Sequence, residues 1–141
     1  MTLKDYPELC AALEHNNLAE SVENRVLVVV LWTRPSPYCV KETIPHLKTL
    51  HGNYHSLGLR IVGINVDSGL NHEALDAFMA ANHVKYPNIF DDGGISGELK
   101  VDGYPTTYVF DRNGVLVGED FEPTDKKGLD ELIAELINVE E

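Results

Sequence analysis

Four consecutive residues, Ser36-Pro37-Tyr38-Cys39, have the spacing of a C-x-x-C redox motif whose first cysteine is a serine. The apolar run of residues 26–32 predicts a buried strand before this motif, and Pro37 suits the first turn of a helix after it. A strand that feeds a helix through such a loop places the Cys39 sulfur near a helix N-terminus. Unpaired N–H groups and the helix dipole favour a thiolate there. We therefore expect Cys39 to be the reactive group of this loop.

Because Ser36 stands in place of the first cysteine, the motif has only one of the two thiols that it normally uses. Dithiol exchange needs one thiolate to attack a disulfide and a second thiol to resolve the mixed disulfide. A serine hydroxyl has far too high a pKa to attack a disulfide, so ordinary turnover through Ser36 should fail. The alternative for Cys39 itself is an inert, partly buried small residue.

Composition limits the classes of function. The chain has 141 residues, 43% of them apolar, and a net charge of −12. This predicts one globular domain over residues 1–141, with a helical extension over about residues 1–24. The negative charge disfavours nucleic acid and membranes as partners. Residues 1–15 are charged and interrupted by Pro7, which predicts no signal peptide and hence a cytoplasmic location.

Apolar periodicity predicts alternating strands and helices. The expected strands are residues 26–32, 59–66, 88–91, 106–110 and 115–119, and the expected helices are 9–15, 18–23, 37–57 with a kink at Pro45, 72–82, 95–100 and 129–139. The strand–helix–strand part predicts parallel pairing, and the final hairpin adds antiparallel strands. The expected fold class is α/β, a mixed central sheet with helices on both faces.

Four stretches in order resemble the thioredoxin superfamily, in particular its TlpA-like redoxin branch. They are Leu31-Trp32, Ser36-Pro37-Tyr38-Cys39 with Glu42 and Pro45, residues 62–67 (VGINVD), and Gly103-Tyr104-Pro105-Thr106-Thr107 leading into residues 110–114 (FDRNG). The resemblance implies a thiol–disulfide oxidoreductase of cell redox homeostasis, acting on protein thiols or disulfides without a cofactor. It also implies a cis bond before Pro105, facing the loop, and a backbone at Tyr104 that can pair with an extended peptide segment.

The chain departs from the family pattern at Ser36 and in the spacing of Pro45, which lies one residue further from Cys39 than usual. The extra residue predicts a bulge or a shifted start in the helix. In the family an acidic residue at the place of Glu42 helps to move protons, and the insertion could turn Glu42 away. The predicted site has two groups: catalytic Cys39, Ser36 and Glu42, and substrate-binding Pro37, Tyr38, Tyr104, Pro105 and Trp32.

Two other functions stay open on the sequence alone. The first is a redox-inactive binding module that holds an extended chain between Tyr38 and Tyr104. The second is a monothiol peroxidase, because S-x-x-C is similar to the T-x-x-C loop of the peroxidase branch, although Trp32 stands where that branch has a proline. His51 and His55 have a spacing that can bind zinc, but no third ligand presents itself and no metal is expected.

Overall fold

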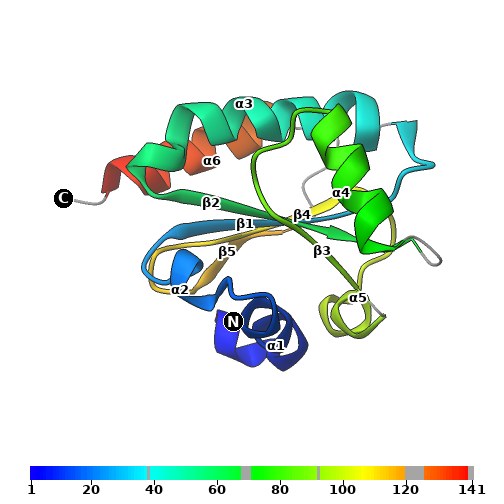
Figure 1. The fold of residues 1–141 in the computed structure, drawn as a ribbon. Helices are drawn as coiled ribbons and strands as arrows, with labels where there is room; N and C mark the ends of the chain where they lie inside the picture. The colour runs from blue at the N-terminus through cyan, green and yellow to red at the C-terminus, as the bar shows by residue number, and fades with distance from the viewer. Residues whose placement is uncertain (38, 68–70, 92, 120–125, 140–141) are drawn as a thin grey trace.

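A mixed five-stranded sheet forms the centre of the protein, with strand order β3-β2-β1-β4-β5 (Figure 1). The computed structural model describes residues 1–37, 39–67, 71–91, 93–119 and 126–139. The strands are β1 (Val26–Trp32), β2 (Leu59–Asn65), β3 (Asn88–Phe90), β4 (Thr106–Phe110) and β5 (Leu116–Gly118). β1 pairs in parallel with β2, and β2 with β3, whereas β4 is antiparallel to both β1 and β5. The fold class expected from the sequence is confirmed.

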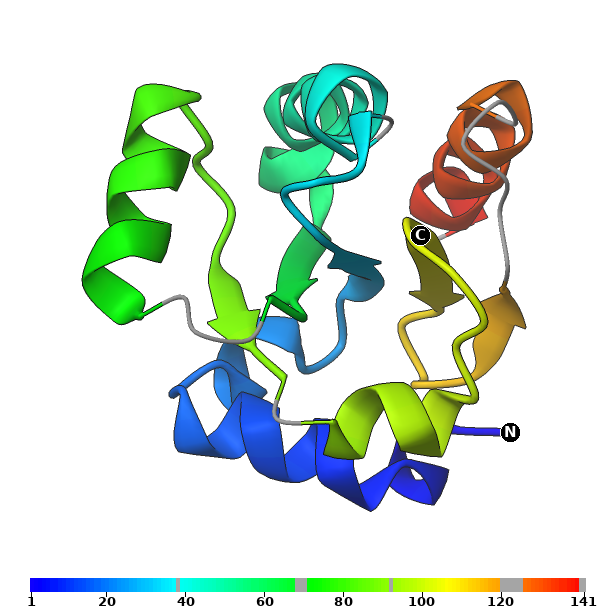
Figure 2. The same ribbon diagram turned by 90° about the vertical axis from the view of Figure 1, so that its right-hand side faces the viewer.

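Helices cover both faces of this sheet, as Figure 2 shows from its edge. They are α1 (Pro7–His15), α2 (Ala19–Val22), α3 (Ile44–Tyr54), α4 (His72–Ala81), α5 (Gly94–Leu99) and α6 (Lys126–Val139), with short 3-10 turns η1 (Leu3–Asp5) and η3 (His55–Leu57). α3, α4 and α6 lie on one face, and α1, α2 and α5 lie on the other. None of the described helices combines the length and apolarity that a membrane span requires.

β1 is the central strand because all seven of its residues are apolar and buried. Successive side chains of a strand point to opposite faces, so they divide between two apolar clusters. Leu27 and Val29 pack in the cluster that contains side chains of α1 and α5. Val28 and Val30 pack in the cluster with side chains of α3 and α6. The strand therefore holds both helical layers to the sheet.

The N-terminal helices, expected as an extension, are part of the packed structure. Leu9 of α1 is 0% exposed and belongs to the cluster under β1. The Glu98 carboxylate of α5 accepts hydrogen bonds from the backbone N–H groups of Glu8 (2.8 Å) and Leu9 (3.1 Å). These donors lie in the first turn of α1, where the helix offers them no partner. An acidic side chain of another helix thus caps α1.

The single helix expected over residues 37–57 is divided. η2 (Cys39–Thr43) is a π-helical turn, α3 follows it, and η3 ends at Leu57, just before Gly58, whose φ is 108°. Pro45 is the second residue of α3 rather than a kink inside a longer helix. The turn directly before Pro45 is π-helical, so the missing N–H and the ring of the proline fall where the α-helical hydrogen-bond pattern is already interrupted. The bulge expected from the spacing is confirmed as η2.

Candidate active-site loop

The loop after β1 and the segment before β4 lie at the same edge of the sheet. The antiparallel register pairs Leu31 of β1 with Thr106 of β4, so the residues just beyond this pair are neighbours. Figure 2 looks onto this edge. The peptide bond between Tyr104 and Pro105 is cis, as expected. The structure therefore brings the Ser36–Cys39 loop and Pro105 to one end of the molecule.

Cys39 is the first residue of η2, and its burial disfavours the thiolate expected at this helix terminus. Its side chain is 0% exposed and packs in an apolar cluster with Trp32, Ile44, Leu75 and Met79. Burial raises the pKa of the Cys39 thiol; hydrogen bonds from the Thr33 backbone and the Ser36 side chain lower it, and the charge of Asp67 adds to the rise. Desolvation outweighs the hydrogen bonds because the charged form loses its water.

Ser36 acts as a helix cap. Its hydroxyl oxygen accepts a hydrogen bond from the Cys39 backbone N–H at 3.3 Å, and its carbonyl accepts one from the Val40 N–H at 3.3 Å. Pro37 follows at the first helical position, which suits a residue without an N–H donor. Serine caps of this kind contribute about 1 kcal/mol to stability. The residue that replaces the nucleophile therefore has a structural role of its own.

Asp67, just beyond β2, holds the entry to the loop, and the sequence analysis missed it. Its carboxylate accepts hydrogen bonds from the Thr33 hydroxyl, the Arg34 backbone N–H (2.9 Å) and the Asn65 side-chain amide (3.0 Å). Burial acts to raise the pKa of Asp67, but these hydrogen bonds and the Arg34 charge lower it overall. The signal in the sequence is the polar pair Asn65 and Asp67 at the end of a buried strand.

Trp32 lies beneath the loop in a fixed orientation. Its side chain is 2% exposed, its indole Nε1 donates to Asn88 Oδ1 at 2.9 Å, and its ring stacks on Phe78 at 5.6 Å between centroids. Gly63 makes this possible, because a Cβ there would lie 1.9 Å from Asn88 Oδ1. Trp32 shapes the site from below and presents almost no surface to a partner.

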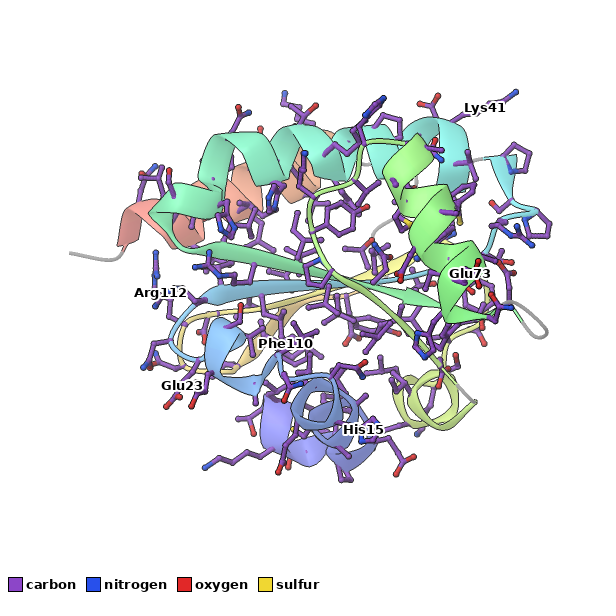
Figure 3. The ribbon with its side chains drawn as sticks, in the orientation of Figure 1. His15, Glu23, Lys41, Glu73, Phe110 and Arg112 are labelled. Carbon is purple, nitrogen blue, oxygen red and sulfur yellow. The ribbon has the colours of Figure 1, made fainter. Side chains whose placement is uncertain are left out.

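The other predicted residues lie around the rim of the loop. Pro37 and Glu42 are exposed, and Glu42 lies on η2. In Figure 3 its neighbour Lys41 projects outward at this end of the molecule. Tyr38 lies outside the described residues.

The segment before β4 contributes one exposed and one buried residue. Tyr104 is 37% exposed, and its hydroxyl donates to Ser96 Oγ at 3.5 Å. Pro105 is buried. Tyr104 is thus the predicted contact on this segment that an incoming chain can reach.

The histidines of α3 and η3 do not form a single group. His46 Nε2 lies 2.6 Å from Asp130 Oδ1 of α6, whereas the rings of His51 and His55 contact each other, tilted by 37°, with centroids 4.6 Å apart. In the described ranges no group of three or more His, Cys, Asp or Glu side chains could hold a metal ion.

Comparison with known families defines the class of protein. The Redoxin family model matches residues 2–134, and the chain belongs to this family. It is similar to the thioredoxin-like protein YneN of Bacillus subtilis (27% identity over 106 residues, covering 73% of this chain and 59% of YneN). It is also similar to the sporulation thiol-disulfide oxidoreductase A of that organism (23% over 108 residues, 75% and 65%). The chain thus spans less than two thirds of each curated relative.

Solved structures support the same fold. A protein described as the thiol:disulfide interchange protein DsbE from Chlorobium tepidum matches with a TM-score of 0.74 and 23% identity, covering 84% of both chains. A thiol-disulfide isomerase from Corynebacterium glutamicum matches with a TM-score of 0.74 and 22% identity, again over 84% of both chains. At these identities the likeness shows the thioredoxin-like fold.

Proposed function

We propose that this chain is a thioredoxin-like thiol–disulfide oxidoreductase of cell redox homeostasis that works through Cys39 alone. The observation that carries the proposal is the position of Cys39, in the loop after β1 and next to the Ser36 hydroxyl, at the same sheet edge as the cis bond before Pro105. Its substrates would be thiols or disulfides in an extended segment of a partner protein, lying against Tyr104. The cytoplasmic location, and the lack of nucleic-acid and membrane partners, stay predictions.

Thiol–disulfide exchange can proceed with Cys39 as the single sulfur of the loop. Because Cys39 is 0% exposed, the loop must open first. Cys39 then loses its proton to water, and the thiolate attacks one sulfur of the partner's disulfide. The partner's S–S bond breaks, a Cys39–partner S–S bond forms, and the second partner sulfur leaves as a thiolate and takes up a proton. Since Ser36 has no sulfur, an external thiol of the glutathione class must attack the mixed disulfide and release Cys39.

The burial of Cys39 favours a second candidate, a redox-inactive module that binds an extended protein segment. A thiol with no exposed surface and a raised pKa is a poor nucleophile. In this alternative the rim of the loop holds the segment through Tyr104 without covalent chemistry, and Ser36 serves only as a cap.

Reduction of insulin by the chain, in the presence of an external thiol, tests the proposal. We compare the chain with Ser36→Cys and with Ser36→Cys combined with Cys39→Ser. We expect slow reduction by the chain, at least about tenfold faster reduction by Ser36→Cys because a resolving pair is restored, and loss of that gain in the double variant.

Incubation with oxidised glutathione separates the two candidates. A glutathione adduct on Cys39, absent in Cys39→Ser, supports the single-sulfur exchange. If no adduct forms on Cys39 and Ser36→Cys is as inactive as the unmodified chain, the redox proposal fails and the binding module replaces it.

A further inference from the structure

The opposite edge of the sheet, at the amino ends of β1 and β2, carries a group of basic side chains. A small hollow of about 70 Å³ is lined by Ser21, His51, His55, Arg60 and Lys85, together with apolar residues. We call it the basic hollow. Most of its lining residues come from α2, the end of α3, η3 and the start of β2. Figure 1 shows these segments away from the loop that follows β1. Figure 3 shows Arg112 at the same end of the molecule and Lys41 at the other.

Arg60 and Lys85 of the basic hollow form no ion pair among the described residues. This is so although the chain has 11 Lys and Arg against 23 Asp and Glu. Arg60 makes its hydrogen bonds through Nη1 alone, to the carbonyls of His55 and Leu59 (2.9 Å each) and to His55 Nδ1 (3.3 Å). Much of this guanidinium is therefore available to a ligand.

The basic groups also repel one another. Burial lowers the pKa of Arg60, and the charge of nearby Arg25 lowers it further. Burial likewise lowers the pKa of His51, and His55 and Arg60 act in the same direction. A negative charge placed among these groups would relieve the repulsion.

His51 supplies an independent indication of a missing partner. Its Nδ1 atom is buried and has no hydrogen-bond partner in the described structure. Leaving such an atom unpaired costs about 1–3 kcal/mol. The ring is held on one side by His55 and lies 6.2 Å from the Tyr86 ring, between centroids. His51 lines the basic hollow, so a ligand there would lie beside this ring.

The chemistry of the lining selects the kind of ligand. Two histidines one helical turn apart can bind zinc, but Arg60 and Lys85 would repel a cation, and the described residues offer no third ligand. Pockets for drug-sized molecules measure about 300–1,000 Å³, so this hollow suits a compact group. Guanidinium and ammonium groups are the usual partners of phosphate oxygens.

We propose that the basic hollow binds a phosphate-type oxyanion, either free phosphate or the phosphate group of a small metabolite. Arg60 and Lys85 supply positive charge, and His51 donates a hydrogen bond once protonated. This site is separate from the Ser36–Cys39 loop and does not depend on the redox proposal.

Proton NMR of the histidine rings, with inorganic phosphate as the probe, tests the proposal. Sodium chloride at equal ionic strength is the parallel titration, and His51→Gln assigns the signal. We expect saturable shifts with phosphate only, and a rise of the His51 pKa by at least about half a unit, because a bound anion favours the charged ring. Competition by a nucleoside monophosphate that binds more tightly than phosphate would identify a metabolite as the source.

Matched variants locate the effect. Lys85→Gln and Arg60→Gln should each weaken phosphate binding about tenfold, whereas Lys127→Gln, which removes the same charge from the exposed face of α6, should not. Lys85 is exposed, so its variant keeps the test valid if Arg60→Gln does not fold. Equal shifts with chloride, unchanged binding in Lys85→Gln, or a stoichiometric response of both rings to zinc would overturn the proposal.

Discussion

The two ends of β1 differ in how their polar and reactive groups are accommodated. At the carboxyl end, Asp67 accepts hydrogen bonds from three neighbouring residues, and Cys39 is enclosed by apolar side chains. At the amino end lies a cleft of about 540 Å³ lined in part by Cys10, Arg25 and Arg112. The sulfur of the redox motif is buried, whereas Cys10 at the other end lines a cleft. A motif in the sequence therefore does not by itself show that its sulfur can be reached.

The rate of thiol labelling should differ most between the two ends of β1, which carry Cys39 and Cys10. Burial raises the pKa of both thiols, but Cys10 is only partly buried whereas Cys39 is 0% exposed. We expect iodoacetamide to label Cys10 faster than Cys39 by roughly two orders of magnitude, as for local opening that costs about 3 kcal/mol. Mass spectrometry on Cys10→Ser and Cys39→Ser measures each rate, with denatured protein as the control. Equal rates in the folded protein would mean that the loop opens freely.

Gly63→Ala should destabilise the protein at the carboxyl end of β1, because the added Cβ would clash with Asn88 and crowd Trp32. The new Cβ would lie 1.9 Å from Asn88 Oδ1 and 3.3 Å from Trp32 Nε1, so the hydrogen bond between these two side chains must break. We expect a loss of about 3 kcal/mol in the free energy of unfolding, measured in urea. Gly52→Ala in α3, where no heavy atom lies within 4 Å of the added Cβ, should instead stabilise by up to about 1 kcal/mol. A neutral Gly63→Ala would show that Asn88 does not fix Trp32.

Asp67→Asn should give a smaller, pH-dependent loss at the same end. The folded pKa of Asp67 is lowered, so its contribution is present above the unfolded pKa of about 3.9 and is lost as pH falls through the folded value. We expect the variant to be about 2 kcal/mol less stable at pH 7, with the difference shrinking below about pH 4. Urea titrations at several pH values measure this, with exposed Asp76→Asn of α4 as the matched control. A difference independent of pH would exclude the charged hydrogen bonds as its cause.

The strand framework was predictable because its signals are local. The apolar run of β1 and the hairpin residues 111–114 predict their elements directly, whereas η2 was predictable only because the Cys39–Pro45 spacing is one residue longer than in the family that the chain resembles. Most boundaries differ by one or two residues, and the largest difference is three, at the start of α6, predicted at residue 129 and observed at Lys126. A local sequence pattern is enough to predict an element whose structure depends mainly on its own residues.

The state of Cys39 was not predictable, because distant segments determine it. Leu75 and Met79 of α4 complete the cluster around the sulfur, and no pattern within the loop reveals them. The bonds from Thr33 to Asp67 and from Glu8 to Glu98 likewise join residues far apart in sequence. Burial and hydrogen-bond partners, which decide a pKa, are properties of the assembled fold.

The extra residue in η2 has a consequence for engineering this loop. An α-helix turns about 100° per residue, but a π-helical turn closes its hydrogen bonds over one residue more, so η2 takes up the extra residue within a single turn. Leu47 and Leu50 are buried and anchor α3 in the core on the C-terminal side of that turn. Deleting one residue between Cys39 and Pro45 must therefore convert η2 into an α-helical turn, which shifts Glu42, whereas substitution at Ser36 leaves η2 as it is.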